Sequence, residues 1–107
     1  MTTDKELLEL AAKAAGIEIY TQIGNTILYK IGKYLGHWNP LISNDDALRL
    51  AVKLSIHVLQ YGTITTAKHV GSTTCFDERG DGQSDKTQEA ATRRAIVRAA
   101  AEIGKSA

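Results

Sequence analysis

The stretch AATRRAIVRAAAEIG, residues 90–104, decides the fold class because it is the clearest helix in the chain. One stripe of residues recurs along it at helical spacing, made of Thr92, Ile96, Ala99 and Ile103. Ser84 or Asp85 is expected to cap its N-terminus. Small alanine side chains let a helix approach its neighbour closely, so the sequence predicts that this helix packs tightly on a β-sheet.

The chain opens with another helix. TDKE, which starts at Thr3, has the pattern of a capping box, in which the first side chain accepts a backbone N–H three residues later. Apolar residues follow at helical spacing, at Leu7, Leu10, Ala11 and Ala14. Gly16 supplies the left-handed residue that commonly ends a helix, so we expect a helix over about residues 4–15.

A third helix is expected in DDALRLAVKL, residues 45–54, with Asn44 or Asp45 as its N-cap. One face is expected to point into the core, with Leu48, Ala51 and Val52. The other face carries a charged stripe, with Asp46, Arg49 and Lys53. This pattern predicts an amphipathic helix that covers one side of a sheet.

Four segments rich in β-branched and aromatic residues are expected to form strands, at residues 17–23, 26–35, 55–61 and 63–76. Gly24 and Asn25 tolerate positive φ and favour a tight hairpin between the first two. The last segment is expected to be one long bent strand or two short strands around Gly71.

The expected order is therefore α-β-β-α-β-β-α, which places the chain in the α+β class. Short connections favour a mainly antiparallel sheet of four to five strands, with three helices packed on it as a sandwich. Residues 1–107 are expected to form a single domain, because smaller pieces could not bury a core of their own.

Composition and charge exclude several classes of protein. The net charge is +1, from 13 basic and 12 acidic residues, so no general attraction to nucleic acid or to an anionic membrane is expected. The single cysteine, Cys75, cannot form an intrachain disulfide and fits a reducing compartment. The opening MTTDKELLEL lacks the apolar run of a secretory signal. We therefore expect a cytoplasmic protein.

Two blocks carry a resemblance to a known family. HWNPLISNDDALRLAVKL, residues 37–54, and AATRRAIVRAAAEIG, residues 90–104, resemble blocks of the phage ABA sandwich domain family of small phage and prophage proteins. The resemblance extends over nearly the whole chain, and it is closest at residues 38–41 and 46–51. It implies a fold and a phage context, and hence the cytoplasm of a host cell. It carries over no catalytic motif.

The segment TTCFDERGDGQSDKT, Thr73–Thr87, resembles a metal loop at first sight because it contains four acids and two glycines. An EF-hand loop that began at Asp77 would have Arg79 at its third position, where an oxygen ligand is required, and Gln88 at its twelfth, where a carboxylate is required. An anion cradle is disfavoured because the four carboxylates would repel an anion. The RGD tripeptide is a chance pattern. We interpret the segment as a solvated connector, with no metal ion or cofactor.

The histidines and the cysteine also do not indicate a metal or catalytic site. His37, His57, His69 and Cys75 lack the short paired spacings of structural zinc sites. Nothing in the sequence places a nucleophile beside a base. No catalytic residue is therefore assigned, and the protein is not expected to be an enzyme.

The arginines of residues 90–104 offer one candidate site. Two of them have a glutamate four residues away, which pairs Arg93 with Glu89 and Arg98 with Glu102. Arg94 lacks such a partner and is repelled by Arg98. Arg94, Arg98 and Lys105 could contact a phosphate or carboxylate, although a solvated helix face is the more ordinary interpretation.

Aromatic residues offer the other candidate site. Tyr20, Tyr29 and Tyr34 cluster in the first hairpin, and Trp38 follows them closely. If these rings are exposed, they form a patch suited to a protein partner, and if they face the helices, they belong to the core. The sequence leaves these two alternatives open.

The preferred function is binding without catalysis. The chain would be a small phage or prophage accessory protein that engages a host or phage protein through the aromatic patch, for example to inhibit host defence. The alternative is a nucleic-acid or nucleotide-binding module, in which Arg94, Arg98 and Lys105 contact phosphate and Tyr29 or Tyr34 stacks on a base.

Overall fold

The computed structural model describes residues 3–17, 19–23, 26–31, 34–61, 64–69, 75–79 and 88–105. These residues form three helices and six strands, which follow one another as α1 (Asp4–Ala15), β1 (Ile19–Ile23), β2 (Thr26–Ile31), β3 (Tyr34–Trp38), α2 (Asn44–Leu54), β4 (Ile56–Tyr61), β5 (Ile64–His69), β6 (Cys75–Arg79) and α3 (Gln88–Lys105). The α+β class and the three helices are as the sequence predicts. Within these residues, no helix combines the length and the apolar character that crossing a membrane requires.

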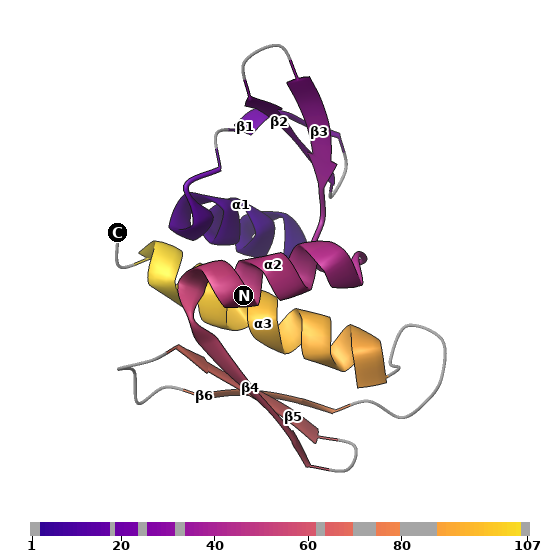
Figure 1. Ribbon diagram of the computed structural model, residues 1–107, viewed down its shortest axis with the longest axis vertical. Helices are drawn as coiled ribbons and strands as arrows, with labels where there is room; N and C mark the ends of the chain where they lie inside the picture. Colours follow the sequence, from indigo (N-terminus) through magenta and orange to yellow (C-terminus); the bar gives the residue numbers. More distant parts are fainter. Residues whose placement is uncertain are drawn as a thin grey trace.

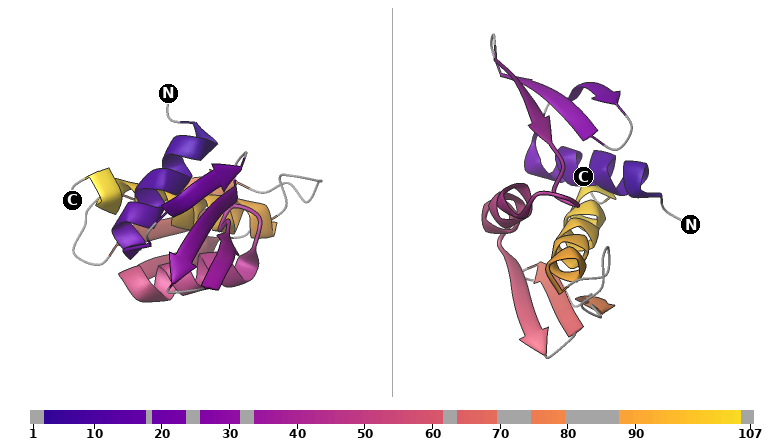
Figure 2. Two further views of the ribbon diagram at one scale, coloured as in Figure 1. Left: turned by 90° about the horizontal axis from the view of Figure 1, so that it is seen from above. Right: turned by 90° about the vertical axis from the view of Figure 1, so that its right-hand side faces the viewer.

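The strands form two sheets rather than one. The N-terminal sheet has the order β1-β2-β3 and the C-terminal sheet the order β4-β5-β6, and every pair is antiparallel. The helices lie between the two sheets (Figure 1 and Figure 2). The predicted single sheet of four to five strands is wrong, because the helices lie between β1-β2-β3 and β4-β5-β6 and keep the two groups of strands apart (Figure 1). Each group of strands therefore pairs only with its neighbours along the chain.

Two strands lie where the sequence was expected to be irregular. β3 ends with His37 and Trp38, which lie beyond the strand predicted over residues 26–35, and β6 runs to Arg79, inside the stretch interpreted as a solvated connector. The segment at residues 63–76 contributes two short strands, as one of the two alternatives predicted. The remainder of Thr73–Thr87, with Asp81 and Asp85, lies outside the described residues.

Helix α3 is the centre of the fold. It packs against α1, α2 and all three strands of the C-terminal sheet. Its contact face is made of small or medium side chains, and Ala95, Ile96, Val97, Ala99 and Ala100 are all buried. At its end, a Cβ on Gly104 would overlap the backbone carbonyl of Leu10. The predicted tight packing of the alanine-rich helix is confirmed, and it extends to α1 as well as to the sheet.

The helix ends agree with the sequence in part. Thr3 Oγ1 accepts the N–H of Glu6 at 3.2 Å, and Gly16 ends α1 in the left-handed conformation with φ 73°, as predicted. Ser43 caps α2, however, because its Oγ accepts the N–H of Asp46 at 3.2 Å. The prediction of Asn44 or Asp45 as the cap is wrong by one or two residues.

The orientation of α2 also differs from the prediction. Ala47, Leu50 and Ala51 are buried, whereas Leu48 is 64% exposed and Val52 is 72% exposed. The two alanines allow a close approach to α3, and a leucine or valine in their place would hold the helices apart. The rotation that buries the alanines turns Leu48 and Val52 outward, so the prediction that these two face the core is wrong.

Candidate protein-binding site

A groove lies between α2, β4 and α3, with a volume of about 360 Å³. We call it the α2–β4 groove. Its apolar part is formed by Ala47, Leu48, Ala51, Val58 and Ile96. Its polar part is formed by Asn44, Gln60, Gln88, Glu89, Thr92 and Arg93.

The apolar part has a floor and a rim. Ala47, Ala51 and Ile96 are buried in the floor, and Val58 is half-buried because β4 turns alternate side chains toward the helices. Leu48 forms the rim and is 64% exposed. Val52 stands one turn further along α2 and is more exposed still. Apolar side chains that gather beside a hollow in this way are typical of a surface that another molecule covers.

Hydrogen bonds fix the polar part of the groove. Thr65 is fully buried behind it, and its hydroxyl donates to Gln60 Oε1 at 2.9 Å and accepts from Gln88 Nε2 at 2.7 Å. Gln60 Nε2 in turn donates to Thr92 Oγ1 at 2.9 Å. These bonds join β4 and β5 to the first turns of α3. The groove wall is therefore held in place by hydrogen bonds within the protein.

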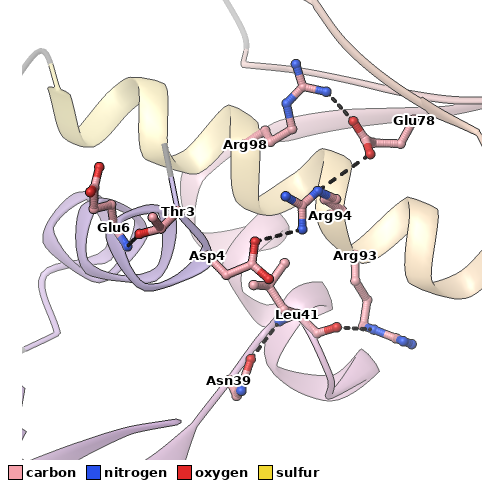
Figure 3. A network of polar contacts seen from close by, with 9 residues as sticks. All are labelled: Thr3, Asp4, Glu6, Asn39, Leu41, Glu78, Arg93, Arg94 and Arg98. Atoms are coloured by element: carbon pink, nitrogen blue, oxygen red, sulfur yellow. Dashed lines mark hydrogen bonds and ion pairs between the residues drawn. The ribbon is translucent and has the colours of Figure 1, made fainter. Parts of the chain in front are cut away.

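Arg93 closes the groove on the side of α2. Its Nε donates to the carbonyl oxygen of Leu41 at 2.9 Å (Figure 3), and its Nη1 donates to Asn44 Oδ1. Asn44 Nδ2 donates to Glu89 Oε2 at 2.9 Å. Asn44 thus bridges Arg93 and Glu89, the two residues that the sequence predicts as a direct pair. Since the two charged side chains are engaged with the protein, the groove offers an essentially neutral surface.

A second hollow, of about 390 Å³, brings together the three candidate anion-binding residues. Arg94, Arg98 and Lys105 all line it. Two carboxylates line it too, those of Glu78 and Glu102, along with the apolar residues Leu7, Phe76 and Ala101. The sequence therefore identified three residues that do lie side by side.

The arginines in this hollow are compensated, contrary to the prediction. Arg94 Nη1 lies 2.9 Å from Asp4 Oδ1, and its Nε lies 3.7 Å from Glu78 Oε1 (Figure 3). Arg98 pairs with the other oxygen of Glu78, and its guanidinium carbon stands 5.1 Å from the centre of the Phe76 ring. These partners come from α1 and β6, whose positions beside α3 are not visible in the local sequence.

Lys105 has an acidic neighbour on its own helix. Its Nζ lies 3.9 Å from Glu102 Oε2, the glutamate that the sequence assigned to Arg98. The second hollow thus combines three cations with nearby carboxylates. Its ion pairs link α3 to α1 and β6.

The aromatic candidates divide into two groups. Trp38 is only 6% exposed and belongs to the core, so for this residue the core alternative holds. Tyr20, Tyr29 and Tyr34 lie on β1, β2 and β3, where Tyr29 pairs with Gly36 and Tyr34 with Ile31. Their side chains lie outside the part of the chain that the structure describes. A partner-binding role for these three tyrosines stays a prediction.

No metal centre is found among the described residues, where no three His, Cys, Asp or Glu side chains come together. Asp77, the first position of the imagined calcium loop, lies on β6 and accepts a hydrogen bond from Thr66 Oγ1 at 2.7 Å. A strand at this point is incompatible with the sharp turn that such a loop requires.

The sequence prediction missed the α2–β4 groove. The signal was present, because Ala47 and Ala51 have the same four-residue spacing as Leu48 and Val52. Helix α2 therefore has two possible inward faces, and preference for the larger side chains selected the wrong one.

Comparison of the chain with protein-family models, with curated proteins and with solved structures gives no match.

Proposed function

We propose that this chain is a small accessory protein of phage or prophage type that binds another protein and catalyses no reaction. The observation that carries the proposal is the α2–β4 groove, with Leu48 on its rim and an ordered floor beneath. Leu48 is 64% exposed, and a partner that covers it lowers the free energy of the complex, because apolar surface is removed from water. A preformed groove also lowers the ordering cost of binding.

The chemistry of the groove favours a protein over nucleic acid. Binding to nucleic acid depends on uncompensated cations that neutralise phosphates. Among the described residues, the lining contains one cation, Arg93, and one carboxylate, Glu89, and both are hydrogen-bonded within the protein. An apolar protein surface fits this lining better than a phosphate backbone does.

The phage context rests on the resemblance of residues 37–54 and 90–104. It places the interaction in the cytoplasm of a host cell, with a host or phage protein as the partner and inhibition of host defence as one role. The hairpin tyrosines Tyr20, Tyr29 and Tyr34 are a second surface that such a partner could use.

The test is a comparison of variants in one binding assay. The tagged protein is used to capture its partner from host lysate, the partner is identified by mass spectrometry, and its affinity is measured with purified proteins. Leu48→Lys should weaken binding about tenfold, because it places a charge in the apolar contact. Ile42→Lys is the matched control, since Ile42 is 71% exposed but does not line the groove.

A variant of the hairpin tyrosines distinguishes binding through the hairpin from binding through the α2–β4 groove. If the hairpin provides the contact, Tyr29→Ala with Tyr34→Ala should weaken binding and Leu48→Lys should not. That outcome would move the site to the N-terminal sheet. Equal affinities for Leu48→Lys and the wild-type protein would contradict the groove as the binding site.

A second candidate function is anion binding in the hollow lined by Arg94, Arg98 and Lys105. The observation that favours it is that the three cations share one hollow. Glu78 and Asp4 oppose it, because they already neutralise the arginines. Affinity for short oligonucleotides that falls steeply with salt, and that Arg94→Ala with Arg98→Ala abolishes, would favour this function over protein binding.

A further inference from the structure

The α2–β4 groove lies beside the free edge of a sheet. Within the described residues, β4 pairs with β5 alone and so leaves one edge of its backbone without a strand partner. The pairing of β4 with β5 is regular over six residues. The groove therefore lies next to a row of backbone N–H and C=O groups that can accept another strand.

The β4 edge lacks the features that protect other edges of this protein. Its sequence, IHVLQY, contains no lysine, arginine, aspartate, glutamate or proline. The opposite edge, β6, carries three charged residues in CFDER, and the register of β1 with β2 is interrupted by an irregularity between Ile19 and Thr21. Charges and bulges are the usual means of preventing a strand from adding to an edge. Of these three edges, β4 is the one open to addition; the fourth edge, β3 (YLGHW), also lacks charges, but no described residue of β3 lines the α2–β4 groove.

We propose that the segment bound in the α2–β4 groove is an extended, uncharged strand of a partner protein, which adds to β4 and continues the C-terminal sheet. This inference rests on the proposed function, since it specifies the partner of the same groove. The added strand turns alternate side chains toward the helices, as β4 itself does with Ile56, Val58 and Gln60.

The lining of the groove defines the sequence of that strand. One inward-facing side chain meets Leu48, Val58 and Ile96, so it is apolar. A neighbouring inward position meets Gln60, Gln88 and Thr92, so it is polar but uncharged. Arg93 and Glu89 carry opposite charges and are both hydrogen-bonded to Asn44, so the described lining of the groove has no net charge to compensate an acidic or basic side chain. Backbone hydrogen bonds to β4 supply affinity, and these pockets supply specificity.

The experiment uses selection from a library of short random peptides displayed on beads, with the full-length protein as the target. Strand addition predicts enriched peptides with uncharged side chains and an apolar residue at every second position. Enrichment of apolar residues at intervals of three and four would indicate a helix in the groove, and enrichment of acidic or basic peptides would indicate a charged contact. Either result, or no enrichment, would overturn the inference.

The best selected peptide is then compared with a copy that is N-methylated at alternate backbone nitrogens. The methyl groups remove the donors of the strand ladder and keep every side chain. We expect about a tenfold loss of affinity in one of the two methylation phases and little change in the other, because only alternate N–H groups face β4. Unchanged affinity in both phases would refute strand addition.

Protein variants distinguish failure of this inference from failure of the proposed function. Leu48→Lys should lower affinity for the peptide, while Ile42→Lys should not. If Leu48→Lys abolishes binding but N-methylation has no effect in either phase, the groove is a protein-binding site that does not extend the sheet. If neither variant changes binding, the groove is not the site, and both the inference and the proposed function are wrong.

Discussion

Gly104 shows how a single residue sets the distance between two helices. A Cβ at this position would overlap the carbonyl of Leu10, so α1 and α3 approach one another as closely as they do because a side chain is absent. Glycine normally weakens a helix interior, by about 1 kcal/mol relative to alanine. Its presence in the last turns of α3 is explained by packing rather than by helix propensity.

We therefore expect Gly104→Ala to destabilise the protein, although alanine is the better helix former. Overpacking costs about 1–3 kcal/mol, which exceeds or cancels the gain of about 1 kcal/mol in helix propensity. The measurement is the midpoint of urea unfolding. A higher midpoint than that of the wild-type protein would mean that α1 lies further from α3.

The cap of α2 gives a second prediction at the scale of the residue. Ser43→Ala should lower the free energy of unfolding by about 1 kcal/mol, because it removes the acceptor of the Asp46 N–H. Asp45→Ala is the comparison, since Asp45 is the cap that the sequence suggested. It should cost less, through the helix dipole alone. A larger loss of unfolding free energy for Asp45→Ala than for Ser43→Ala would mean that Asp45, as the sequence predicted, is the N-cap.

Among the structural elements, α1, β6 and α3 are joined by Glu78. Its two carboxylate oxygens receive Arg94 and Arg98, and Arg94 also reaches Asp4 on α1 (Figure 3). The glutamate side chain is 21% exposed, so it is screened less than an ion pair at the open surface. The three elements are thus held by two carboxylates, those of Glu78 and Asp4, as well as by apolar packing.

Glu78→Ala should therefore lower stability by about 1 kcal/mol, and the difference from the wild-type protein should shrink at high salt. The control is Glu102→Ala, because the Glu102 carboxylate is more exposed and lies 3.9 Å from Lys105. Loss of Glu78 also leaves the two arginines with less negative charge. The variant should thus bind oligonucleotides more tightly than the wild-type protein at low salt, and unchanged binding would weigh against any anion-binding role for this hollow.

Sequence patterns predicted those parts of these elements that depend on neighbouring residues. Gly16 and Thr3 act through contacts within a few residues, so the ends of α1 could be predicted. The buried face of α3 was predicted in part, since Ile96 and Ala99 are buried but Thr92 and Ile103 are half-buried. The face of α2 could not, because Ala47 and Ala51 compete with Leu48 and Val52 at the same spacing and only the approach of α3 decides between them. The acidic partners of Arg94 could not be predicted for the same reason, since Asp4 and Glu78 become neighbours of Arg94 only in the folded protein.

For the whole molecule, the two sheets lie on opposite sides of the helices (Figure 2), and no three His, Cys, Asp or Glu side chains of the described residues come together. We expect calcium, magnesium and zinc to leave the melting temperature unchanged. Specific binding at a hundred times the dissociation constant would add about 2.7 kcal/mol of stability. An increase that Asp77→Ala with Asp81→Ala abolishes would contradict the interpretation of this stretch as a connector.

The central place of α3 has a consequence for how the protein is made. Translation proceeds from the N-terminus, so α1, α2 and the C-terminal sheet leave the ribosome before the helix that all of them contact. Until α3 emerges, the residues that pack against it remain in water, among them Leu8, Ala47 and Ala67. Closure of the core therefore waits for α3. Such a chain spends the time of its own translation exposed to chaperones and proteases.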